Sequence, residues 1–432
     1  MNKSTVQITD EYKRCLDAIE QGVPLIFVTG GGGTGKSTLI DLVKKKKKNV
    51  YAVVTPTGIS ALNVSGQTIH SFFGFPPKMM SNDEASNKRC PDIELFKKLD
   101  ILIIDEISMV RADMLENMDI CLRKWRRNNL PFGGLQVVMF GDLMQLPPVV
   151  SDADYDMYYS KYNSSWFFDA EVIRTNPMLT IELTKTFRQK DFEFSSMLNA
   201  IRMNENHRDA VAKLNRECYR DYKGEEQDLV LCSTNAIADG INEKKLAILL
   251  GESRSYQANI EGKFKENRLP APERLTLKVG AQVMVTKNIG KAVNGTIGIV
   301  VSLQDNVIRI LDKRTKKHLS ITREIWEKSK YTLSDTGITQ ETIGEYEQFP
   351  LTLAWAITIH KSQSLTLNSV EINLGSGAFA AGMGYVAISR CTHIEGIRLT
   401  KPLRMGDVRA DKEALAFYRG IKRANQGFLQ AA

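Results

Sequence analysis

Cysteine is scarce in this sequence, and its few copies do not cluster. No Cys-x-x-Cys pair occurs, and the six cysteines lie far apart, at Cys15, Cys90, Cys121, Cys218, Cys232 and Cys391. Zinc ribbons and disulfide-stapled folds both need grouped cysteines. The pattern therefore excludes both kinds of fold and fits a reducing cytosol.

Long apolar runs are also absent. No run approaches the roughly 20 residues that a helix needs to cross a bilayer, and the first residues lack the basic-then-apolar order of a signal peptide. We therefore expect a protein that is neither secreted nor bound to a membrane. The cytoplasm of a bacterium or phage host, at the nucleoid, is the predicted location.

A strong excess of one charge sign is missing as well. Lys and Arg number 58 against 50 Asp and Glu, for a net charge of +8 and a pI near 9.0. This small excess favours nucleic acid as a partner only weakly. With 43% apolar and 25% charged residues, the chain is globular rather than disordered or coiled coil. Its 432 residues fit two or three domains of about 150 residues each.

Short apolar runs alternate with helical stretches in the first part of the chain. Such runs are typical of strands buried on both faces of a parallel sheet, and they occur at residues 25–28, 50–54, 101–104 and 137–140. We expect a doubly wound α/β domain over residues 1–175. Strands at 229–232 and 370–374, with helices at 194–202 and 241–250, predict a second α/β domain formed by residues 176–258 and 346–432.

Residues 259–345 interrupt the second domain and have a different sequence pattern. Apolar stretches at 281–287, 298–303 and 307–311 are separated by Asn294-Gly295 and Asp305-Asn306, which are hairpin signals. We predict a small inserted β-barrel, with a polar stretch over 334–348 leading back out of it. A smaller insertion at about 75–95 fits no strand of the first sheet.

A glycine-rich motif follows the first predicted strand. Residues 30–37, Gly-Gly-Gly-Gly-Thr-Gly-Lys-Ser, match the P-loop pattern G-x-x-x-x-G-K-[ST]. Backbone N–H groups of such a loop surround phosphate oxygens, Lys36 reaches the β and γ phosphates, and Ser37 ligates Mg²⁺. A flexible glycine turn is the alternative, but the strand before and the helix after disfavour it. The predicted nucleotide-binding residues are Gly30, Gly33, Thr34, Gly35, Lys36, Ser37 and Thr38.

Two carboxylates follow the strand at 101–104. The C-terminal edge of a parallel sheet is where α/β proteins bind ligands, so Asp105 can share Mg²⁺ with Ser37, and Glu106 can orient and deprotonate the attacking water. An acidic pair that caps the next helix is the alternative, which the upstream P-loop disfavours. No Asn-Lys-x-Asp guanine signature occurs, which favours ATP over GTP.

Further motifs of the first half resemble those of superfamily 1 helicases. Residues 55–61, Thr-Pro-Thr-Gly-Ile-Ser-Ala, look like motif Ia, and residues 66–73 look like motif Ib. Residues 141–148, Gly-Asp-Leu-Met-Gln-Leu-Pro-Pro, are similar to motif III. The resemblance implies that Gln145 senses the γ phosphate, and the combination points to the Pif-type and RecD-like branch of 5′-to-3′ DNA helicases.

The second half of the chain contains segments that resemble the remaining helicase motifs. Residues 183–189 resemble motif IV, His-Lys-Ser-Gln at 360–363 motif V, and residues 385–390 motif VI. Because a guanidinium can bridge transferring phosphoryl oxygens, the resemblance implies catalytic roles for Arg188 and Arg390. A surface ion pair is the alternative for either arginine taken alone.

The resemblance runs from residue 8 to 399 and implies two RecA-like P-loop domains whose cleft closes and opens as the motor stroke. Residues 277–284 look like the start of the family's Src-homology-3-like domain, and residues 75–91 would be its small insertion near the strand-separating wedge. Two positions depart from the family pattern. Tyr12 stands where a glutamine recognises adenine, and Ser364 replaces a glycine in motif V, where a Cβ could hinder a close backbone approach.

Single-stranded DNA is held through its phosphates by hydroxyls, amides and cations, and through its bases by stacking. The motif positions predict DNA contacts at Thr55, Pro56, Thr57, Thr68, His70, Phe72, Thr358, His360 and Lys361. Buried histidines are the alternative for His70 and His360, and Phe72 could equally belong to the core. The lysines at 44–48 are expected to form a solvated helix end rather than a DNA-binding patch.

The sequence therefore predicts a monomeric ATP- and Mg²⁺-dependent motor on single-stranded and forked DNA, with no membrane partner. By resemblance, its substrates would extend to G-quadruplex DNA and RNA–DNA hybrids. The alternative is a DNA-dependent ATPase that moves along DNA and remodels bound protein without unwinding. Sequence does not separate these two functions, because the same motor serves both.

Overall fold

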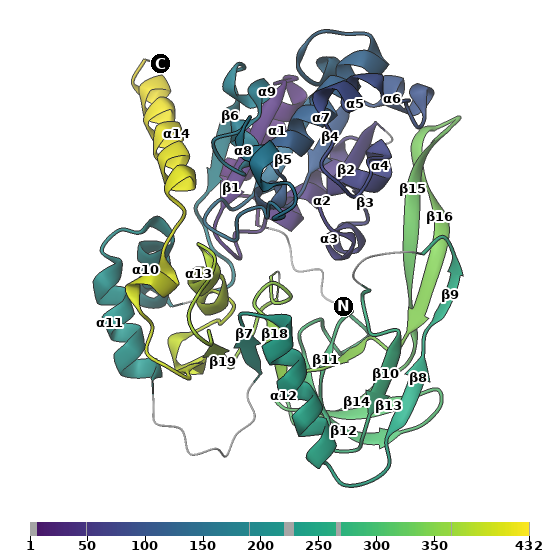
Figure 1. The fold of residues 1–432 in the computed structure, drawn as a ribbon, viewed down its shortest axis with the longest axis vertical. Coiled ribbons are helices and arrows are strands. Elements are labelled where there is room, and N and C mark those ends of the chain that lie inside the picture. Colours follow the sequence, from purple (N-terminus) through teal and green to yellow (C-terminus); the bar gives the residue numbers. More distant parts are fainter. Residues whose placement is uncertain are drawn as a thin grey trace. The chain divides into compact units, whose positions relative to one another are not determined.

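The computed structural model describes residues 7–48, 50–189, 191–219, 229–264, 269–363 and 365–431 (Figure 1). The chain divides into two compact units. Unit 1 comprises Met1–Phe187, Ser329–Glu341 and Lys412–Ala432, and unit 2 comprises Arg188–Lys328 and Thr342–Asp411. Ser364, the predicted departure in motif V, lies outside the described residues.

A parallel sheet of six strands, in the order β3-β2-β4-β5-β1-β6, forms the centre of unit 1. Four of these strands match the predicted apolar runs and are buried along nearly their whole length, as strands covered on both faces should be. The first α/β domain is thus confirmed. The strands are β1 (Leu25–Gly30), β2 (Tyr51–Thr55), β3 (Gln67–Thr68), β4 (Ile101–Ile104), β5 (Gln136–Gly141) and β6 (Leu179–Leu183).

Helices with one apolar face pack on this sheet. In α1, the buried residues Tyr12, Cys15 and Ile19 recur at the spacing of one helix face, and they join Leu39 and Val43 of α2 in a core with the strands. The helices of unit 1 outside its small insertion are α1 (Asp10–Glu20), α2 (Lys36–Lys46), α3 (Gly58–Asn63), α4 (Ile69–Phe73), α7 (Ala112–Arg126), α8 (Tyr155–Tyr159), α9 (Glu171–Arg174) and α14 (Lys412–Ala431).

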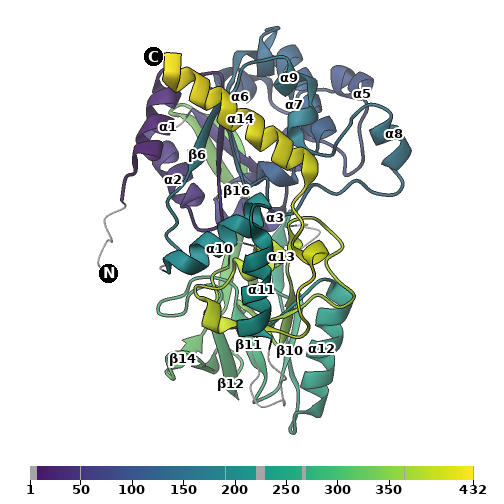
Figure 2. The same ribbon diagram turned by 90° about the vertical axis from the view of Figure 1, so that its left-hand side faces the viewer.

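The predicted boundary of the first domain at residue 175 was wrong. Strand β6 lies beyond it and pairs in parallel with β1, with Val28 opposite Ile181. The C-terminal helix α14 also groups with unit 1, although its sequence position had placed it in the second domain. Its Phe417 ring stacks on Phe168 with centroids 4.1 Å apart, and Figure 2 shows α14 running across the helices of this unit.

The small insertion of unit 1 is helical and contains no strand among its described residues. It holds α5 (Asn82–Asn87) and α6 (Ile93–Lys98), and both pack against α7. The Phe96 and Trp125 rings lie 4.8 Å apart, and the Trp125 indole N–H donates to the carbonyl of Lys88. Trp125 therefore anchors the insertion.

Unit 2 contains a second parallel sheet, in the order β18-β7-β19-β20. Its strands β7 and β19 lie where residues 229–232 and 370–374 were predicted to form strands, which confirms the second RecA-like domain. The strands are β7 (Val230–Cys232), β18 (Ala356–Thr358), β19 (Val370–Asn373) and β20 (Ile397–Leu399). The helices are α10 (Phe192–Met203), α11 (His207–Cys218), α12 (Asn235–Ile248) and α13 (Met383–Ile388).

An antiparallel β domain is inserted between β7 and β18, as predicted. Its five-stranded sheet has the order β14-β13-β12-β11-β17, and the turns at Asn294-Gly295 and Asp305-Asn306 join successive strands. Inward side chains such as Val283, Val300 and Ile310 fill its core. The strands are β8 (Arg254–Gln257), β9 (Asn259–Gly262), β10 (Arg274–Leu277), β11 (Gln282–Val285), β12 (Ile297–Leu303), β13 (Ile308–Asp312), β14 (His318–Ile321) and β17 (Leu351–Leu353).

A long hairpin takes the place of the polar exit segment predicted for 334–348. Strands β15 (Glu324–Ser334) and β16 (Gly337–Gln348) form a sheet with β9, and the hairpin tip belongs to unit 1. The Val53 N–H donates to the Tyr331 hydroxyl at 2.9 Å, and the Tyr331 N–H donates to Gln67 Oε1 at 3.1 Å. Gln340 also donates to the Ser65 carbonyl. The tip is therefore fixed to the β2–β3 region.

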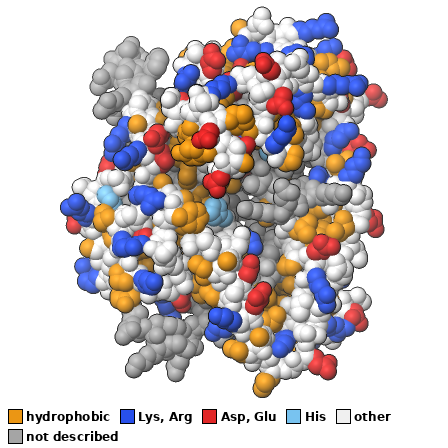
Figure 3. All heavy atoms as spheres, in the orientation of Figure 1, with side chains coloured by type: hydrophobic (Ala, Val, Ile, Leu, Met, Phe, Trp, Pro, Cys, Tyr) orange, Lys and Arg blue, Asp and Glu red, His pale blue; other side chains and the backbone are white. Residues whose placement is uncertain are grey.

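The surface carries no single basic stripe on the face that Figure 3 displays, where Lys and Arg are interspersed with Asp and Glu. This distribution agrees with the modest net charge of +8. Within the described ranges, no helix has both the length and the apolar character that crossing a bilayer requires.

Candidate nucleotide site and nucleic-acid interface

The P-loop connects β1 directly to α2. Gly33 and Gly35 both have φ of +83°, a left-handed conformation that favours glycine. A Cβ on Gly30 would lie 2.8 Å from the Leu183 carbonyl oxygen, so this position accepts only glycine. The sequence thus folds into a loop whose backbone can turn toward phosphate at the N-terminus of α2.

The polar side chains of the P-loop bind its own carbonyl groups in this structure. Lys36 Nζ donates to Gly30 O at 2.7 Å and to Gly31 O at 3.2 Å, and the Thr34 hydroxyl donates to Gly31 O at 3.0 Å. Ser37 and Thr38 occupy the first turn of α2, which holds no acidic residue. A phosphate would therefore meet donors and the positive end of a helix without a competing carboxylate.

Tyr12 lies beneath this loop rather than beside it. Its side chain is 2% exposed, and its hydroxyl donates to Gly35 O at 2.8 Å and lies 3.3 Å from Thr34 O. Burial raises the pKa of the Tyr12 phenol, with a smaller contribution from Glu11. Tyr12 therefore supports the P-loop backbone, and its buried ring does not present a polar edge to a nucleobase.

Phe187 is a candidate site residue that the sequence reasoning missed. Its ring is 44% exposed, its N–H donates to Gly33 O at 2.8 Å, and the position of a Cβ on Gly35 would be 3.5 Å from the ring. An exposed aromatic ring beside a phosphate loop can stack on a nucleobase. The signal was present in motif IV, where an aromatic residue directly precedes Arg188.

Asp105 and Glu106 follow β4, as predicted. Burial, reinforced by the charge of Glu106, raises the pKa of Asp105 to about 7. Asp105 Oδ1 accepts the Glu106 N–H at 2.9 Å, and Glu106 has φ of +55°, a conformation that costs a non-glycine residue about 1 to 3 kcal/mol. Strain at this carboxylate is consistent with a functional position.

A divalent cation suits these residues. The buried Asp105 carboxylate needs positive charge, and hydroxyl and carboxylate oxygens are the ligands that Mg²⁺ prefers together with phosphate. Ser37 and Asp105 would supply those oxygens. In the described part of the chain, no group of three or more His, Cys, Asp or Glu side chains could hold a metal, so these two residues would be only part of a ligand set.

Gln145 lies in the loop after β5 and is oriented by Asp142. Its amide donates to Asp142 Oδ2 at 3.1 Å, while Asp142 Oδ1 accepts the Met144 N–H. The end of β5 touches the loop that carries Glu106, because a Cβ on Gly141 would lie 2.8 Å from Ile107 Cγ2. Motif III and the carboxylate loop are thus in contact within unit 1.

The two predicted arginines converge in unit 2. Arg390 is fully buried, and its guanidinium donates to Val386 O and to the Ser389 hydroxyl, both at 2.9 Å. Arg188 donates to the Ser389 carbonyl at 3.3 Å and to the Thr366 hydroxyl at 3.1 Å. Burial lowers the pKa of Arg188 from its ordinary value. Ser389 therefore joins both arginines.

The threonines of motifs Ia and Ib shape the loops after β2 and β3. Thr55 is buried and donates to the Thr57 carbonyl at 2.8 Å, with Pro56 half-buried between them. Thr57 and Thr68 cap α3 and α4 by accepting backbone N–H groups of the first turn. Their hydroxyls are thus engaged locally, and both loops lie at the carboxyl ends of parallel strands.

Of the two ring residues predicted in motif Ib, only His70 is accessible. Burial, reinforced by Arg111, lowers the pKa of the half-buried His70, which favours a neutral ring. For Phe72, the structure favours the alternative of a core residue. Its ring is 4% exposed and packs against Phe96 and Tyr331 at 5.0 and 5.7 Å.

In unit 2, the predicted DNA contacts surround the end of β18. The Thr358 hydroxyl accepts the Lys361 N–H at 3.3 Å, and Lys361 is exposed. The half-buried His360 ring stacks on Phe379, with ring planes 17° apart and centroids at 6.4 Å. Phe379 is 60% exposed and was missed by the sequence reasoning, since no motif contains it.

The lysine run at the end of α2 has the structure expected of a helix end. Lys44 donates to the Val64 carbonyl at 2.7 Å, and burial lowers its pKa. Lys46 pairs with Glu20 at 2.5 Å. Two of the five lysines thus have intramolecular partners.

Comparisons with known proteins agree on one family. A family model described as PIF1-like helicase matches residues 7–210, and one described as DNA helicase Pif1, 2B domain, matches residues 264–303. The ATP-dependent DNA helicase PIF1 of Xenopus laevis is 33% identical over 97% of this chain and 65% of its own length. The chain spans about 65% of the length of such curated relatives.

Solved structures match over nearly the whole chain. Bacteroides sp. Pif1 in complex with ADP-AlF4 is 37% identical, with a TM-score of 0.91, over 97% of this chain and 98% of its own. Bacteroides Pif1 bound to single-stranded DNA is also 37% identical, with a TM-score of 0.70, over 98% of each chain.

Proposed function

Because this chain belongs to the PIF1-like helicase family, we propose that it is an ATP-dependent DNA helicase that moves 5′ to 3′ on single-stranded DNA and separates the duplex ahead. The observation that carries the proposal is the P-loop with Asp105 and Glu106 in unit 1, together with the arginines that converge on Ser389 in unit 2. A protein that only bound nucleic acid would not need this hydrolytic set.

ATP is the proposed nucleotide. On binding, Lys36 exchanges the P-loop carbonyls for the β and γ phosphates, and the base stacks on Phe187. Mg²⁺ held by Ser37 and Asp105 would supply positive charge against the phosphates. Tyr12 supports the P-loop backbone through its buried hydroxyl. The ADP-AlF4 bound to the Bacteroides relative supports this assignment.

The proposed hydrolytic side chains are Glu106, Gln145, Arg188 and Arg390. Glu106 orients the attacking water and accepts its proton. Gln145, whose amide donates to Asp142, senses the γ phosphate. Arg188 and Arg390 neutralise the charge that develops on the transferred phosphoryl group. Glu106 is the N-cap residue of the short 3-10 helix Ile107–Met109 that follows β4.

The proposed partner is single-stranded DNA, including the tail of a fork, and the binding of single-stranded DNA by Bacteroides Pif1 supports it. Backbone amides and hydroxyls of the strand-end loops bind phosphates, and His360 with Phe379 offers an aromatic platform for a base. The contacts are proposed at Thr55, Pro56, Thr57, Thr68, His70, Thr358, His360, Lys361 and Phe379. A monomer in a bacterial cytoplasm is the proposed state, and G-quadruplex DNA and RNA–DNA hybrids are proposed further substrates.

The measurement that tests this function is ATP hydrolysis with and without single-stranded DNA. The wild type should hydrolyse ATP faster with DNA, and Lys36→Ala should abolish hydrolysis while keeping its melting temperature. Equal rates with and without DNA would contradict the proposal. A protein stimulated by DNA but unable to separate strands would instead be the translocase that remodels nucleoprotein.

A further inference from the structure

A glycine-containing loop joins β19 to α13 in unit 2. It spans residues 374–382, and Gly375, Gly377 and Gly382 all have positive φ, at +62°, +135° and +74°. Glycine at these positions leaves the backbone with little conformational preference of its own. Contacts from elsewhere must therefore fix the loop, which we call the Phe379 loop.

This loop carries a proposed DNA contact, and the helix that follows the loop leads to a proposed catalytic arginine. Phe379 stacks on His360, the proposed DNA contact at the end of β18. Gly382 is the N-cap of α13, and Arg390 follows the C-terminus of this helix by two residues. A shift of the loop would move both the aromatic platform and the arginine.

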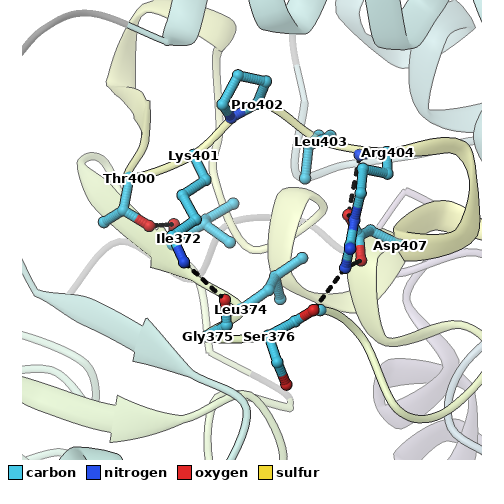
Figure 4. Close-up of a pocket in the computed structure, with 11 residues that line it drawn as sticks. Ile372, Leu374, Gly375, Ser376, Thr400, Lys401, Pro402, Leu403, Arg404 and Asp407 are labelled. Atoms are coloured by element: carbon cyan, nitrogen blue, oxygen red, sulfur yellow. Dashed lines mark hydrogen bonds and ion pairs between the residues drawn. The ribbon is translucent and has the colours of Figure 1, made fainter.

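A second segment, residues 404–409, holds the Phe379 loop along its length, and we call it the loop clamp. Arg404 donates to Ser376 O at 2.6 Å, as Figure 4 shows, and Asp407 Oδ1 accepts the Ala378 N–H at 2.9 Å. The Arg404 side chain also pairs with Asp407 at 3.2 Å. Although burial opposes ionisation, the hydrogen bonds from Arg404 and Ala378 hold the pKa of Asp407 below its ordinary value.

Arg409 completes the clamp at the part of the loop nearest α13. Its guanidinium donates to Ala378 O at 3.1 Å and to Phe379 O at 2.8 Å, and its carbonyl accepts the Gly382 N–H at 2.9 Å. One residue therefore binds the backbone of the platform residue Phe379 and the N-cap of the arginine helix.

The Phe379 loop packs closely against the loop clamp at Gly377. A Cβ on Gly377 would lie 2.0 Å from Arg404 Nη2 and 2.9 Å from Asp407 Oδ1, so a larger residue would displace the Arg404–Asp407 pair. Nearby, the ends of β19 and β20 and the clamp line a cavity of about 300 Å³. Residues 374–377 of the Phe379 loop form part of the wall of this cavity.

We propose that the loop clamp is a positioning element that makes DNA contact at Phe379 and the placement of Arg390 depend on one another, so that DNA stimulates hydrolysis through it. This inference rests on the proposed function. It names Arg404, Asp407 and Arg409 as positioning residues, because none of them is proposed to touch nucleotide or DNA.

The test is a double-mutant cycle on DNA-stimulated ATP hydrolysis. Arg409→Ala removes the two guanidinium hydrogen bonds to the loop. We expect the DNA-stimulated rate to fall by about tenfold or more, because hydrogen bonds from a charged donor are stronger than neutral ones. The rate without DNA should stay within about twofold. Phe379→Ala should also lower the DNA-stimulated rate, and the double variant should be no worse than the more affected single variant.

Three further variants complete the design. Arg409→Lys keeps the charge and one donor group, so it should recover part of the stimulation. Gly377→Ala displaces the other half of the clamp and should also lower only the stimulated rate. Arg216→Ala, which removes an exposed arginine of α11 paired with Glu217, is the matched control and should behave like the wild type.

Specific outcomes would overturn the inference. Additive losses in the double variant, an equal fall in the rates with and without DNA, or normal stimulation in Arg409→Ala would each contradict it. A wild type that lacks any stimulation by DNA would instead contradict the proposed function.

Discussion

The hydroxyl of Tyr12 donates a hydrogen bond of 2.8 Å to the carbonyl oxygen of Gly35, the residue that begins the P-loop helix. A phenol has a single O–H donor, and this one is directed into the protein. Tyr12 therefore contributes to the shape of the loop from below. Discrimination between nucleobases has to come from other groups, such as those around the exposed ring of Phe187.

Tyr12→Phe tests this role. Removal of the buried hydroxyl should lower the free energy of unfolding by about 1 kcal/mol, because one intramolecular hydrogen bond is lost. The ratio of KM for ATP to KM for GTP should stay the same as in the wild type. Steady-state hydrolysis of both nucleotides and urea unfolding measure the two effects, and a changed KM ratio would mean that the hydroxyl reads the base.

Glu106→Gln should bind ATP normally and hydrolyse it slowly. The amide cannot accept a proton from water, and loss of a general base typically costs about 10²- to 10⁴-fold in rate. Single-turnover hydrolysis and fluorescent-nucleotide binding would separate the two steps. Normal turnover in this variant would remove Glu106 from the mechanism.

Arg390→Ala should keep ATP binding and lose hydrolysis by about 10³-fold or more, since an arginine that neutralises phosphoryl charge contributes that much. Because the Arg390 side chain is buried and donates to Val386 O, the melting temperature of Arg390→Ala must be compared with that of Arg390→Lys. Weak nucleotide binding with a normal hydrolysis rate would assign Arg390 to binding instead.

The pKa of Asp105, raised to about 7 by burial and by Glu106, predicts a pH effect on stability without metal. A raised carboxyl pKa stabilises the fold below the unfolded pKa near 4, and this contribution is lost as pH rises through 7. Asp105→Asn stays neutral throughout. Asp105→Asn should therefore be more stable than the wild type. The difference between their unfolding free energies, measured in EDTA, should be larger at pH 8 than at pH 5. An advantage independent of pH would show that the charge is already compensated.

Much of the proposed nucleotide site could be located in the sequence, because its residues follow strands and turns within a few positions. The P-loop spacing defines Lys36 and Ser37, and a buried apolar run followed by two acids defines Asp105. The convergence of Arg188 and Arg390 on Ser389 could not be read from spacing, because it joins residues about 200 positions apart.

The other differences between prediction and structure have the same cause, which is contact between residues far apart in the chain. Phe72 was left open between a DNA contact and a core residue, and Tyr331 covers its ring from a hairpin more than 250 residues away in the chain. Residues 179–183, which form β6, were placed in the second domain because the sequence does not reveal their pairing with β1. Phe379 belongs to no motif, and only its stacking on His360 in the fold makes it a candidate.

Strand separation on forked DNA with a single 5′ or a single 3′ tail tests the central claim most directly. In the presence of ATP and Mg²⁺, the wild type should unwind only the fork with the 5′ tail, and Lys36→Ala should unwind neither. Unwinding from the 3′ tail alone would contradict the account.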